Sequence, residues 1–82
     1  MQRILLIDDD RQLGAPLAAY CARFELELLQ ALRPSEGLAL LRQGGFDAAI
    51  LDVMLPEMDG FELCRTIRKD SDIPIVTVSY TL

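Results

Sequence analysis

Acidic residues stand directly after two short apolar runs of the sequence. Asp8, Asp9 and Asp10 follow the run RILLI, and Asp52 follows the run AAIL. Carboxylates gathered at one site repel one another unless a proton or a cation offsets their charge. Since only oxygen ligands are on offer, Mg²⁺ is the natural cation. A carboxylate beside Mg²⁺ can act as a nucleophile toward phosphorus, so the pattern indicates phosphoryl chemistry.

Each acidic feature also has an ordinary interpretation. Residues 8–10 fit a solvated loop in which Asp10 caps a helix, and Asp52 fits a common loop acid. The combination of the two features, in a chain whose elements alternate in the right order, is far more specific than either one. The choice therefore depends on the elements that carry these residues.

The elements are predicted from short apolar runs, helical spacing and breaking residues. Strands are predicted over residues 3–7, 26–31, 48–51 and 75–78, and helices over residues 11–23, 34–43 and 60–69, with Asp10 as the N-cap of the first helix. This strand–helix alternation predicts an α/β fold with parallel strands and helices on both faces. Ligands of such folds bind at the carboxyl ends of the strands. If the first and third strands are neighbours, Asp8, Asp9 and Asp52 meet there.

Composition narrows the function classes. The 82 residues suffice for one small domain, with 8 Lys+Arg, 13 Asp+Glu, a net charge of −5 and no histidine. Histidine-based triads and metal sites are thereby excluded. Cys21 and Cys64 are too few for a cysteine-only zinc site and are interpreted as reduced packing residues.

Charge and hydropathy predict the compartment. The acidic balance argues against a nucleic-acid or anionic membrane surface. A hydrophobic fraction of 51% excludes a disordered chain. The apolar run before Asp8 is too short for a signal peptide or a membrane span, so a cytoplasmic location is expected.

The strings ILLIDDD, FDAAILDVMLPEMDGFELCRTIR and DIPIVTVS together resemble the receiver domain of bacterial two-component response regulators. The segment DVMLPEMDG resembles the branch in which a receiver is joined to a winged-helix DNA-binding domain. This resemblance spans essentially the whole chain. It implies a flavodoxin-like doubly wound parallel sheet with strand order 2-1-3-4. Residues 1–82 are expected to form an incomplete receiver domain that lacks the family's fourth helix, fifth strand and fifth helix.

The resemblance also implies roles for individual residues. Asp52 matches the phosphoacceptor, and Asp8 and Asp9 match the acidic pair that holds Mg²⁺, Asp9 directly and Asp8 mainly through water. Met54 matches the position whose backbone carbonyl completes the metal site. Ser79 matches the hydroxyl that contacts the phosphoryl group and switches the conformation. In three further positions the chain follows or leaves the family pattern: Pro56 and Gly60 match the loop that shapes the acceptor turn, and Tyr80 replaces a residue that is generally small.

The implied function is that of a phosphoacceptor that assists its own modification rather than an enzyme. A sensor histidine kinase would donate the phosphoryl group to Asp52, and the modified domain would control an output domain. The chain itself is expected to bind neither nucleic acid nor membrane, although the parent protein is expected to carry a DNA-binding domain. The fourth strand is predicted to be an apolar edge strand, and the first helix is predicted to have an exposed apolar face. Self-association or domain swapping is therefore also predicted.

Two alternatives remain at this point. In the first, the fold is a non-catalytic assembly module that uses the fourth-strand edge, and the acidic site is vestigial. In the second, the chain is a phosphatase of the haloacid dehalogenase kind, with Asp8 as nucleophile and Asp10 as the second acid. Gln12 departs from the Thr or Val usual in those enzymes, and the string DVMLPEMDG stays unexplained.

Overall fold

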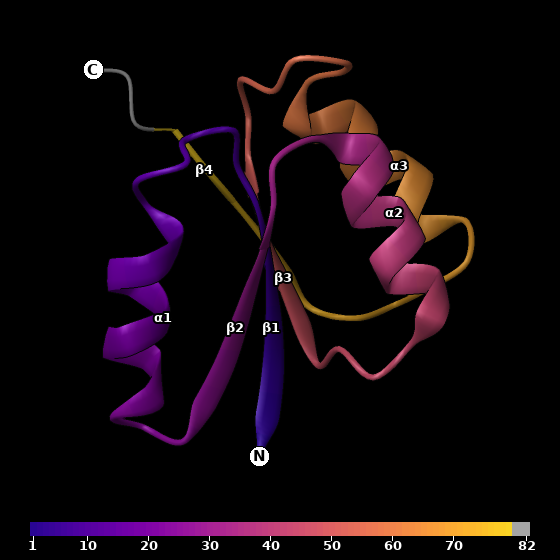
Figure 1. Cartoon of the computed structure of the whole chain (residues 1–82). Helices are drawn as coiled ribbons and strands as arrows, with labels where there is room; N and C mark the ends of the chain where they lie inside the picture. Colours follow the sequence, from indigo (N-terminus) through magenta and orange to yellow (C-terminus); the bar gives the residue numbers. More distant parts are fainter. Residues whose placement is uncertain (80–82) are drawn as a thin grey trace.

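The computed structural model describes residues 1–79, so the prediction about Tyr80 lies outside the described residues. Strands and helices alternate along the whole described chain (Figure 1). The seven elements are β1 (Gln2–Ile7), α1 (Gly14–Ala22), β2 (Leu26–Ala31), α2 (Pro34–Gln43), β3 (Ala48–Asp52), α3 (Gly60–Arg68) and β4 (Ile75–Val78).

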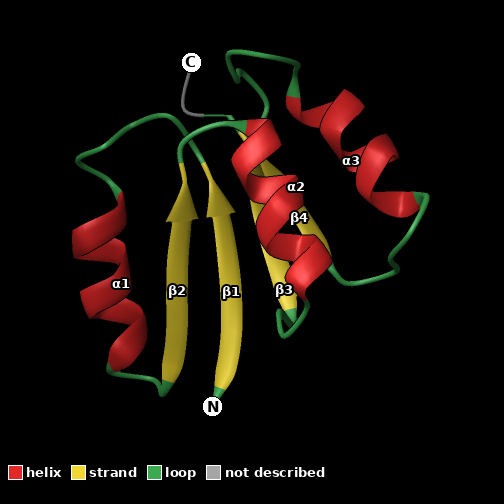
Figure 2. Cartoon of the chain, turned by 45° about the vertical axis from the view of Figure 1, so that its right-hand side comes forward, coloured by secondary structure: helices red, strands yellow, loops and turns green. Residues whose placement is uncertain are grey.

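The four strands form one sheet in the order β2-β1-β3-β4, and every neighbouring pair is parallel. This confirms the predicted α/β fold and its strand order. In the register, Ile7 pairs with Ala31 on one side and with Leu51 on the other, and Asp52 pairs with Val78. The carboxyl ends of the strands therefore lie at one edge of the sheet (Figure 2).

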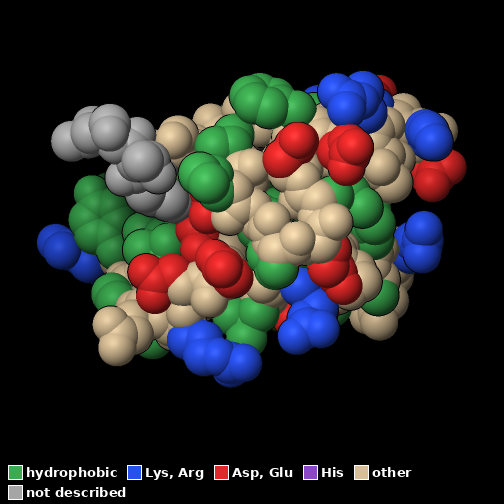
Figure 3. All heavy atoms as spheres, turned by 90° about the horizontal axis from the view of Figure 1, so that it is seen from above, with side chains coloured by type: hydrophobic (Ala, Val, Ile, Leu, Met, Phe, Trp, Pro, Cys, Tyr) green, Lys and Arg blue, Asp and Glu red, His purple; other side chains and the backbone are tan. Residues whose placement is uncertain are grey.

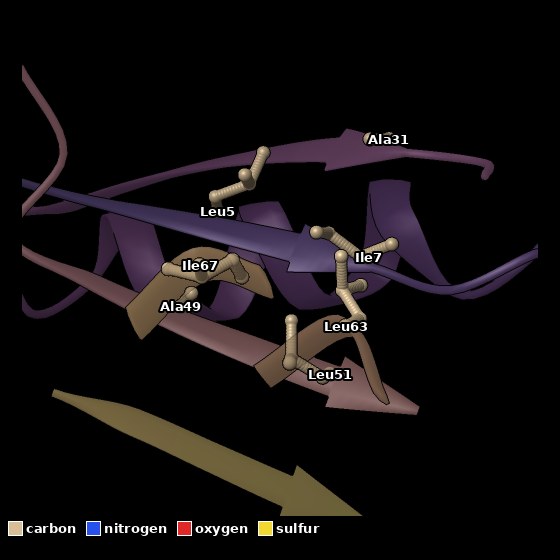
Figure 4. Packing of buried hydrophobic residues seen from close by; sticks show 7 residues of the cluster. All are labelled: Leu5, Ile7, Ala31, Ala49, Leu51, Leu63 and Ile67. Carbon is tan, nitrogen blue, oxygen red and sulfur yellow. The ribbon is translucent and has the colours of Figure 1, made fainter. Parts of the chain in front are cut away.

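Helices cover both faces of the sheet, as predicted. Helix α1 lies on one face, and α2 and α3 lie on the other (Figures 1 and 2). Alternate strand residues point to opposite faces. The main apolar core lies under α2 and α3 and consists of Leu5, Ile7, Ala31, Ala49, Leu51, Leu63 and Ile67 (Figure 4). Leu6 alternates with Leu5 and Ile7 along β1 and is also fully buried, toward α1.

The predicted start of the first helix is wrong. Helix α1 begins at Gly14, and its N-cap residue is Leu13 rather than Asp10. The Asp10 side chain accepts a hydrogen bond from the Gln12 N–H (2.9 Å), and its carbonyl accepts one from the Leu13 N–H (3.2 Å). Asp10 therefore stabilises a turn before the helix instead of capping it, because a short Asp side chain readily bonds the backbone two residues on.

The other predicted bounds agree with the structure to within one residue. Strand β1 begins one residue earlier than predicted, β3 includes Asp52, and α3 ends at Arg68 instead of Lys69. Helix α2 ends at Gln43, and its C-cap residue Gly44 has φ +82°, a conformation that glycine adopts without strain. The punctuation by glycine and proline therefore predicted these bounds well.

Two apolar regions are exposed to solvent in the described part of the chain. Strand β4 has β3 as its strand neighbour in the sheet order and lies at the sheet edge, with Val76 57% exposed. On α1, the exposed Tyr20 lies near the exposed Phe24, which follows the helix, and their ring centroids are 5.2 Å apart. Among the described residues, none of the helices is long and apolar enough to span a membrane.

Candidate functional site

The predicted acidic cluster forms at the carboxyl edge of the sheet. Asp8 and Asp9 follow β1, and Asp52 is the last residue of the neighbouring strand β3. Each of these three residues offers a carboxylate oxygen, and the three oxygens lie within 4.8 Å of one another. Seen from above, Asp and Glu side chains gather on this face of the molecule (Figure 3). The structure thus brings together the three carboxylates that the sequence singled out.

Asp8 is the most constrained member of the cluster. It is only 2% exposed, its N–H donates to the Ala31 carbonyl (3.0 Å), and its Oδ1 accepts from the Asp10 N–H (2.9 Å). Its Oδ2 is buried and has no hydrogen-bond partner among residues 1–79. A buried acceptor without a partner is costly, so this oxygen suits a proton or a cation.

The electrostatic environment of Asp8 favours its neutral form. Burial raises the pKa of the Asp8 carboxyl above its usual value, and the nearby charges of Asp52, Asp9 and Asp10 raise it further, against the lowering effect of the hydrogen bond from the Asp10 N–H. A cation reverses this preference because it attracts the ionised form. An oxygen-only donor set with a partnerless buried oxygen therefore fits Mg²⁺.

Asp52 is held by the backbone that follows it. It is 7% exposed, and its Oδ1 accepts from the Met54 N–H (3.1 Å). Gly60, at the start of α3, donates its N–H to the Val53 carbonyl (3.0 Å). A Cβ at Gly60 would lie 2.6 Å from the Asp52 carbonyl oxygen and 2.8 Å from the Val53 Cα. Because both of these are backbone atoms, the close approach of α3 to Asp52 requires glycine.

The loop between β3 and α3 is tied to α2 through Glu57. The Glu57 carboxylate accepts from the Ser35 N–H (2.8 Å) and from the Ser35 hydroxyl (3.1 Å). Arg33, the N-cap residue of α2, makes no side-chain capping bond, so Glu57 caps this helix from another part of the chain. The two bonds from Ser35 lower the pKa of Glu57, with Arg33 adding to the effect.

The remaining predicted site residues lie near the cluster in sequence and register. The Met54 side chain is 67% exposed, in the loop directly after Asp52. Ser79 is exposed and follows Val78, the register partner of Asp52. Both residues therefore belong to the carboxyl edge, and their assigned roles stay predictions.

Sequence reasoning missed two residues that hold the site loops in place, Glu57 and Gln30. The Gln30 amide nitrogen donates to the carbonyls of Asp8 and Asp10, at 2.8 Å each. A polar residue near the end of the apolar strand LELLQA was a usable signal for Gln30, because that strand ends at the same edge as Asp8. Glu57 had no such signal, since its partner lies 22 residues away in another element.

Comparisons with known proteins agree with this geometry. The family model described as response regulator receiver domain matches residues 4–81. The transcriptional regulatory protein AfsQ1 of Streptomyces coelicolor is 39% identical over 79 residues, which cover 96% of this chain and 35% of AfsQ1. The chain spans about a third of the length of the curated relatives that it matches.

Solved structures show the same fold. The BeF3-activated N-terminal receiver domain of Klebsiella pneumoniae RstA has a TM-score of 0.90 and 28% identity, covering 99% of this chain and 69% of that one. The response regulator TrrA of Thermotoga maritima, in complex with Mg²⁺-BeF, has a TM-score of 0.89 and 29% identity, covering 99% and 71%. TrrA in complex with the histidine kinase ThkA has a TM-score of 0.90 and 30% identity, covering 98% and 70%.

The family match spans nearly all of the chain, and the acidic cluster lies at the edge where the strand order requires it. The flavodoxin-like sheet and the relatives' names agree with that match. This chain belongs to the response regulator receiver domain family.

Proposed function

We propose that this chain accepts a phosphoryl group on Asp52 in a Mg²⁺-dependent reaction. One observation carries the proposal: carboxylate oxygens of Asp8, Asp9 and Asp52 lie within 4.8 Å of one another. At such separations each pair of ionised carboxylates repels by on the order of 1 to 4 kcal/mol, depending on the local dielectric. Family membership and the Mg²⁺-BeF complex of TrrA support the same chemistry.

The residues that would hold Mg²⁺ are those named from the sequence. Asp9, Asp52 and the Met54 carbonyl would bind it directly, and Asp8 would act mainly through water. When bound, Mg²⁺ offsets the carboxylate repulsion and the charge that develops on the transferred phosphoryl group. The buried Asp8 Oδ2, which has no partner among the described residues, supports this assignment.

The remaining chemistry belongs to the protein chain. The Met54 N–H orients the Asp52 carboxylate through its bond to Oδ1 (3.1 Å). The other carboxylate oxygen attacks phosphorus, a P–O bond forms, and the P–N bond to the donor histidine breaks as the imidazole recovers a proton. Ser79 then turns toward the phosphoryl group, which shifts the domain between two conformations. Asp52 is thus a phosphoacceptor within a regulatory domain and not the nucleophile of a turnover enzyme.

The test is intact mass after incubation with Mg²⁺ and acetyl phosphate. We expect one phosphate adduct on the parent chain and none on Asp52→Asn, which keeps the shape of the side chain but weakens its nucleophilicity. Chelation of Mg²⁺ should also remove the adduct. A parent chain without an adduct, or an Asp52→Asn variant that keeps it, would contradict the proposal.

The two alternatives predict different properties of the acidic cluster. A vestigial site in an assembly module predicts no Mg²⁺ binding by calorimetry although the acidic residues are intact. The phosphatase alternative makes Asp8 a nucleophile, yet Asp8 is 2% exposed and its Oδ1 already accepts a hydrogen bond. Membership of the receiver family also accounts for the string DVMLPEMDG, which the phosphatase interpretation does not explain.

Self-association of the 82-residue chain is a second proposal, which rests on exposed apolar surface. Val76 on the β4 edge is 57% exposed, and Tyr20 and Phe24 are 56% and 58% exposed. An apolar edge strand can pair with the same edge of a second copy. Light scattering after size exclusion should give a mass above that of one chain, and Val76→Lys should reduce it. A parent chain that elutes as a monomer would rule out this proposal.

The partners of the whole protein are proposals drawn from the relatives. TrrA forms a complex with a histidine kinase, and we infer that a sensor histidine kinase phosphorylates this chain in the cytoplasm. AfsQ1 is a transcriptional regulatory protein, which supports a DNA-binding output domain in the parent protein. The chain alone, with a net charge of −5, should give no salt-dependent gel shift with DNA.

A further inference from the structure

Gln30 is a polar side chain within β2, on the face that α1 covers. In the sheet it pairs with Leu6 of β1, and the next pair is Ile7 with Ala31. Gln30 therefore lies beside the end of β1, where the loop that carries the acidic residues begins. A half-buried amide at this position needs hydrogen-bond partners.

The partners of Gln30 are two carbonyls of the acidic loop. Its Nε2 donates to the Asp8 carbonyl and to the Asp10 carbonyl, with both distances 2.8 Å. An amide group has two N–H donors, so this pair of bonds uses both of them. The two accepting carbonyls belong to the residues on either side of Asp9. The backbone of Asp9 is thus fixed from both sides by one side chain.

The other hydrogen bonds of this loop do not provide the same link. The bonds from the Asp10 N–H to Asp8 and from the Gln12 N–H to Asp10 span two residues each, so they shape the loop without joining it to the sheet. The bond from the Asp8 N–H to Ala31 joins only the first residue of the loop to β2. The Gln30 bond to Asp10 spans 20 residues and holds the far side of the loop. It opposes the repulsion among the clustered carboxylates, which favours their separation.

Gly14, the first residue of α1, leaves the space in which the Gln30 amide lies. A Cβ at Gly14 would overlap the Gln30 Oε1 atom. This oxygen is the far end of a flexible side chain, so an alanine at position 14 would displace the amide. The same Cβ would lie 3.3 Å from the Gln30 Cβ, which requires β2 to move only slightly. The Gln30 amide can therefore occupy this position only because residue 14 has no side chain.

We propose that Gln30 is a positioning residue that fixes the backbone on both sides of Asp9 and thereby directs the Asp9 carboxylate toward Asp8 and Asp52. The inferred effect of Gln30 on Mg²⁺ affinity rests on the proposed Mg²⁺-dependent function. Residues that orient metal ligands through hydrogen bonds typically change metal affinity by about 10- to 100-fold when replaced. Gln30 acts through the backbone of its neighbours and touches neither the phosphoryl group nor the metal.

The test compares Gln30→Met with the parent chain. Methionine has nearly the same length and no charge but donates no hydrogen bond. We expect the Asp10 amide to exchange its hydrogen about tenfold faster without metal, and the Mg²⁺ dissociation constant to rise about tenfold. Gln2→Met, at the opposite end of β1, makes the same chemical change on an exposed residue and should alter neither quantity.

Gly14→Ala provides a second variant that keeps Gln30 in the chain. Alanine is the better helix former, so a purely structural view predicts an unchanged or higher unfolding midpoint with unaltered exchange and binding. The proposal predicts a folded protein with faster Asp10 exchange and weaker Mg²⁺ binding, because the amide is displaced. This variant also decides the matter if Gln30→Met fails to fold.

The outcomes separate this inference from the proposed function. A parent chain that binds no Mg²⁺ refutes the proposed metal site, and the exchange of the Asp10 amide in the metal-free chain then still decides the role of Gln30. A Gln30→Met variant that loses stability while exchange and Mg²⁺ affinity stay at parent values would show a structural role only and overturn the inference.

Discussion

Strands β1 and β3 carry the best-packed residues of the molecule and its least favourable charges, one residue apart. Ile7 and Leu51 are fully buried in the apolar core under α2 and α3. The next residues along each strand are Asp8 and Asp52, which are 2% and 7% exposed. The core stabilises the fold, whereas the edge holds carboxylates that repel one another. Apolar packing on β1 and β3 therefore holds together carboxylates that would otherwise separate.

Removing side-chain volume from the core should give the largest change in stability. Leu51→Ala deletes a fully buried side chain beside Ile7 and Leu63 and should lower the free energy of unfolding by about 2 to 5 kcal/mol. In a domain of this size that loss is a large share of the total. Urea unfolding followed by circular dichroism measures it.

A matched truncation on the outermost strand, β4, supplies the control. Val76 is 57% exposed, so Val76→Ala should change the free energy of unfolding by less than about 0.5 kcal/mol. Equal losses in the two variants would contradict the assignment of stability to the core under α2 and α3. Asp52→Asn removes one of the clustered charges, so it should not lower the free energy of unfolding, whereas it should abolish the phosphate adduct. Its two effects therefore separate the core from the acidic cluster by function.

Removing a charge from the acidic edge should have the opposite sign. Asp8→Asn keeps an oxygen that can accept from the Asp10 N–H but removes one of the clustered charges. We expect the metal-free fold to gain about 1 kcal/mol at neutral pH, the lower end of the repulsion within one carboxylate pair, and the Mg²⁺ affinity to fall. Urea unfolding and calorimetry measure the two quantities. A metal-free Asp8→Asn variant that is less stable than the parent would show that repulsion among the clustered carboxylates does not destabilise the fold.

The pH dependence of this gain follows from the raised pKa of Asp8. A carboxyl whose pKa is higher in the folded state than in the unfolded state binds more protons when folded. Its contribution to stability is therefore complete below 3.8, the ordinary value, and is lost as pH rises through the folded-state pKa. The advantage of Asp8→Asn should accordingly grow with pH over that window. An advantage of Asp8→Asn that stays constant over that window would contradict the raised pKa of Asp8.

The acidic cluster was predicted from the sequence, whereas the hydrogen bonds that hold its loops were not. The apolar runs of β1 and β3 each stop at an acidic residue, and parallel pairing then brings Asp8, Asp9 and Asp52 together. The start of α1 was missed because Asp10 bonds to its own loop, a local competition that helical spacing does not reveal. Gln30 acts on carbonyls 20 and 22 residues away, and no periodicity marks such a pair.

The smallest expected effect concerns Glu57, which supports the loop after Asp52. Its pKa is lowered chiefly by the hydrogen bond from the Ser35 N–H, then by the bond from the Ser35 hydroxyl, with Arg33 as a further favourable charge. A carboxyl with a depressed pKa contributes stability above its unfolded value of 4.5 and loses it as pH falls through the lower folded-state value. The chemical shift of the Ser35 amide should therefore titrate with a midpoint below 4.5.

Glu57→Gln sharpens this prediction because the amide can still accept from Ser35 but has no proton to gain over this range. The acidic titration of the Ser35 amide should disappear in this variant and persist in Glu25→Gln, an exposed residue at the turn before β2. A midpoint at or above 4.5 in the parent chain would show that Glu57 does not cap α2 in solution. The loop after Asp52 would then have lost its hydrogen-bonded link to α2, and the core contacts of Leu55 and Met58 and the backbone bonds of Val53 would hold the acceptor side of the site.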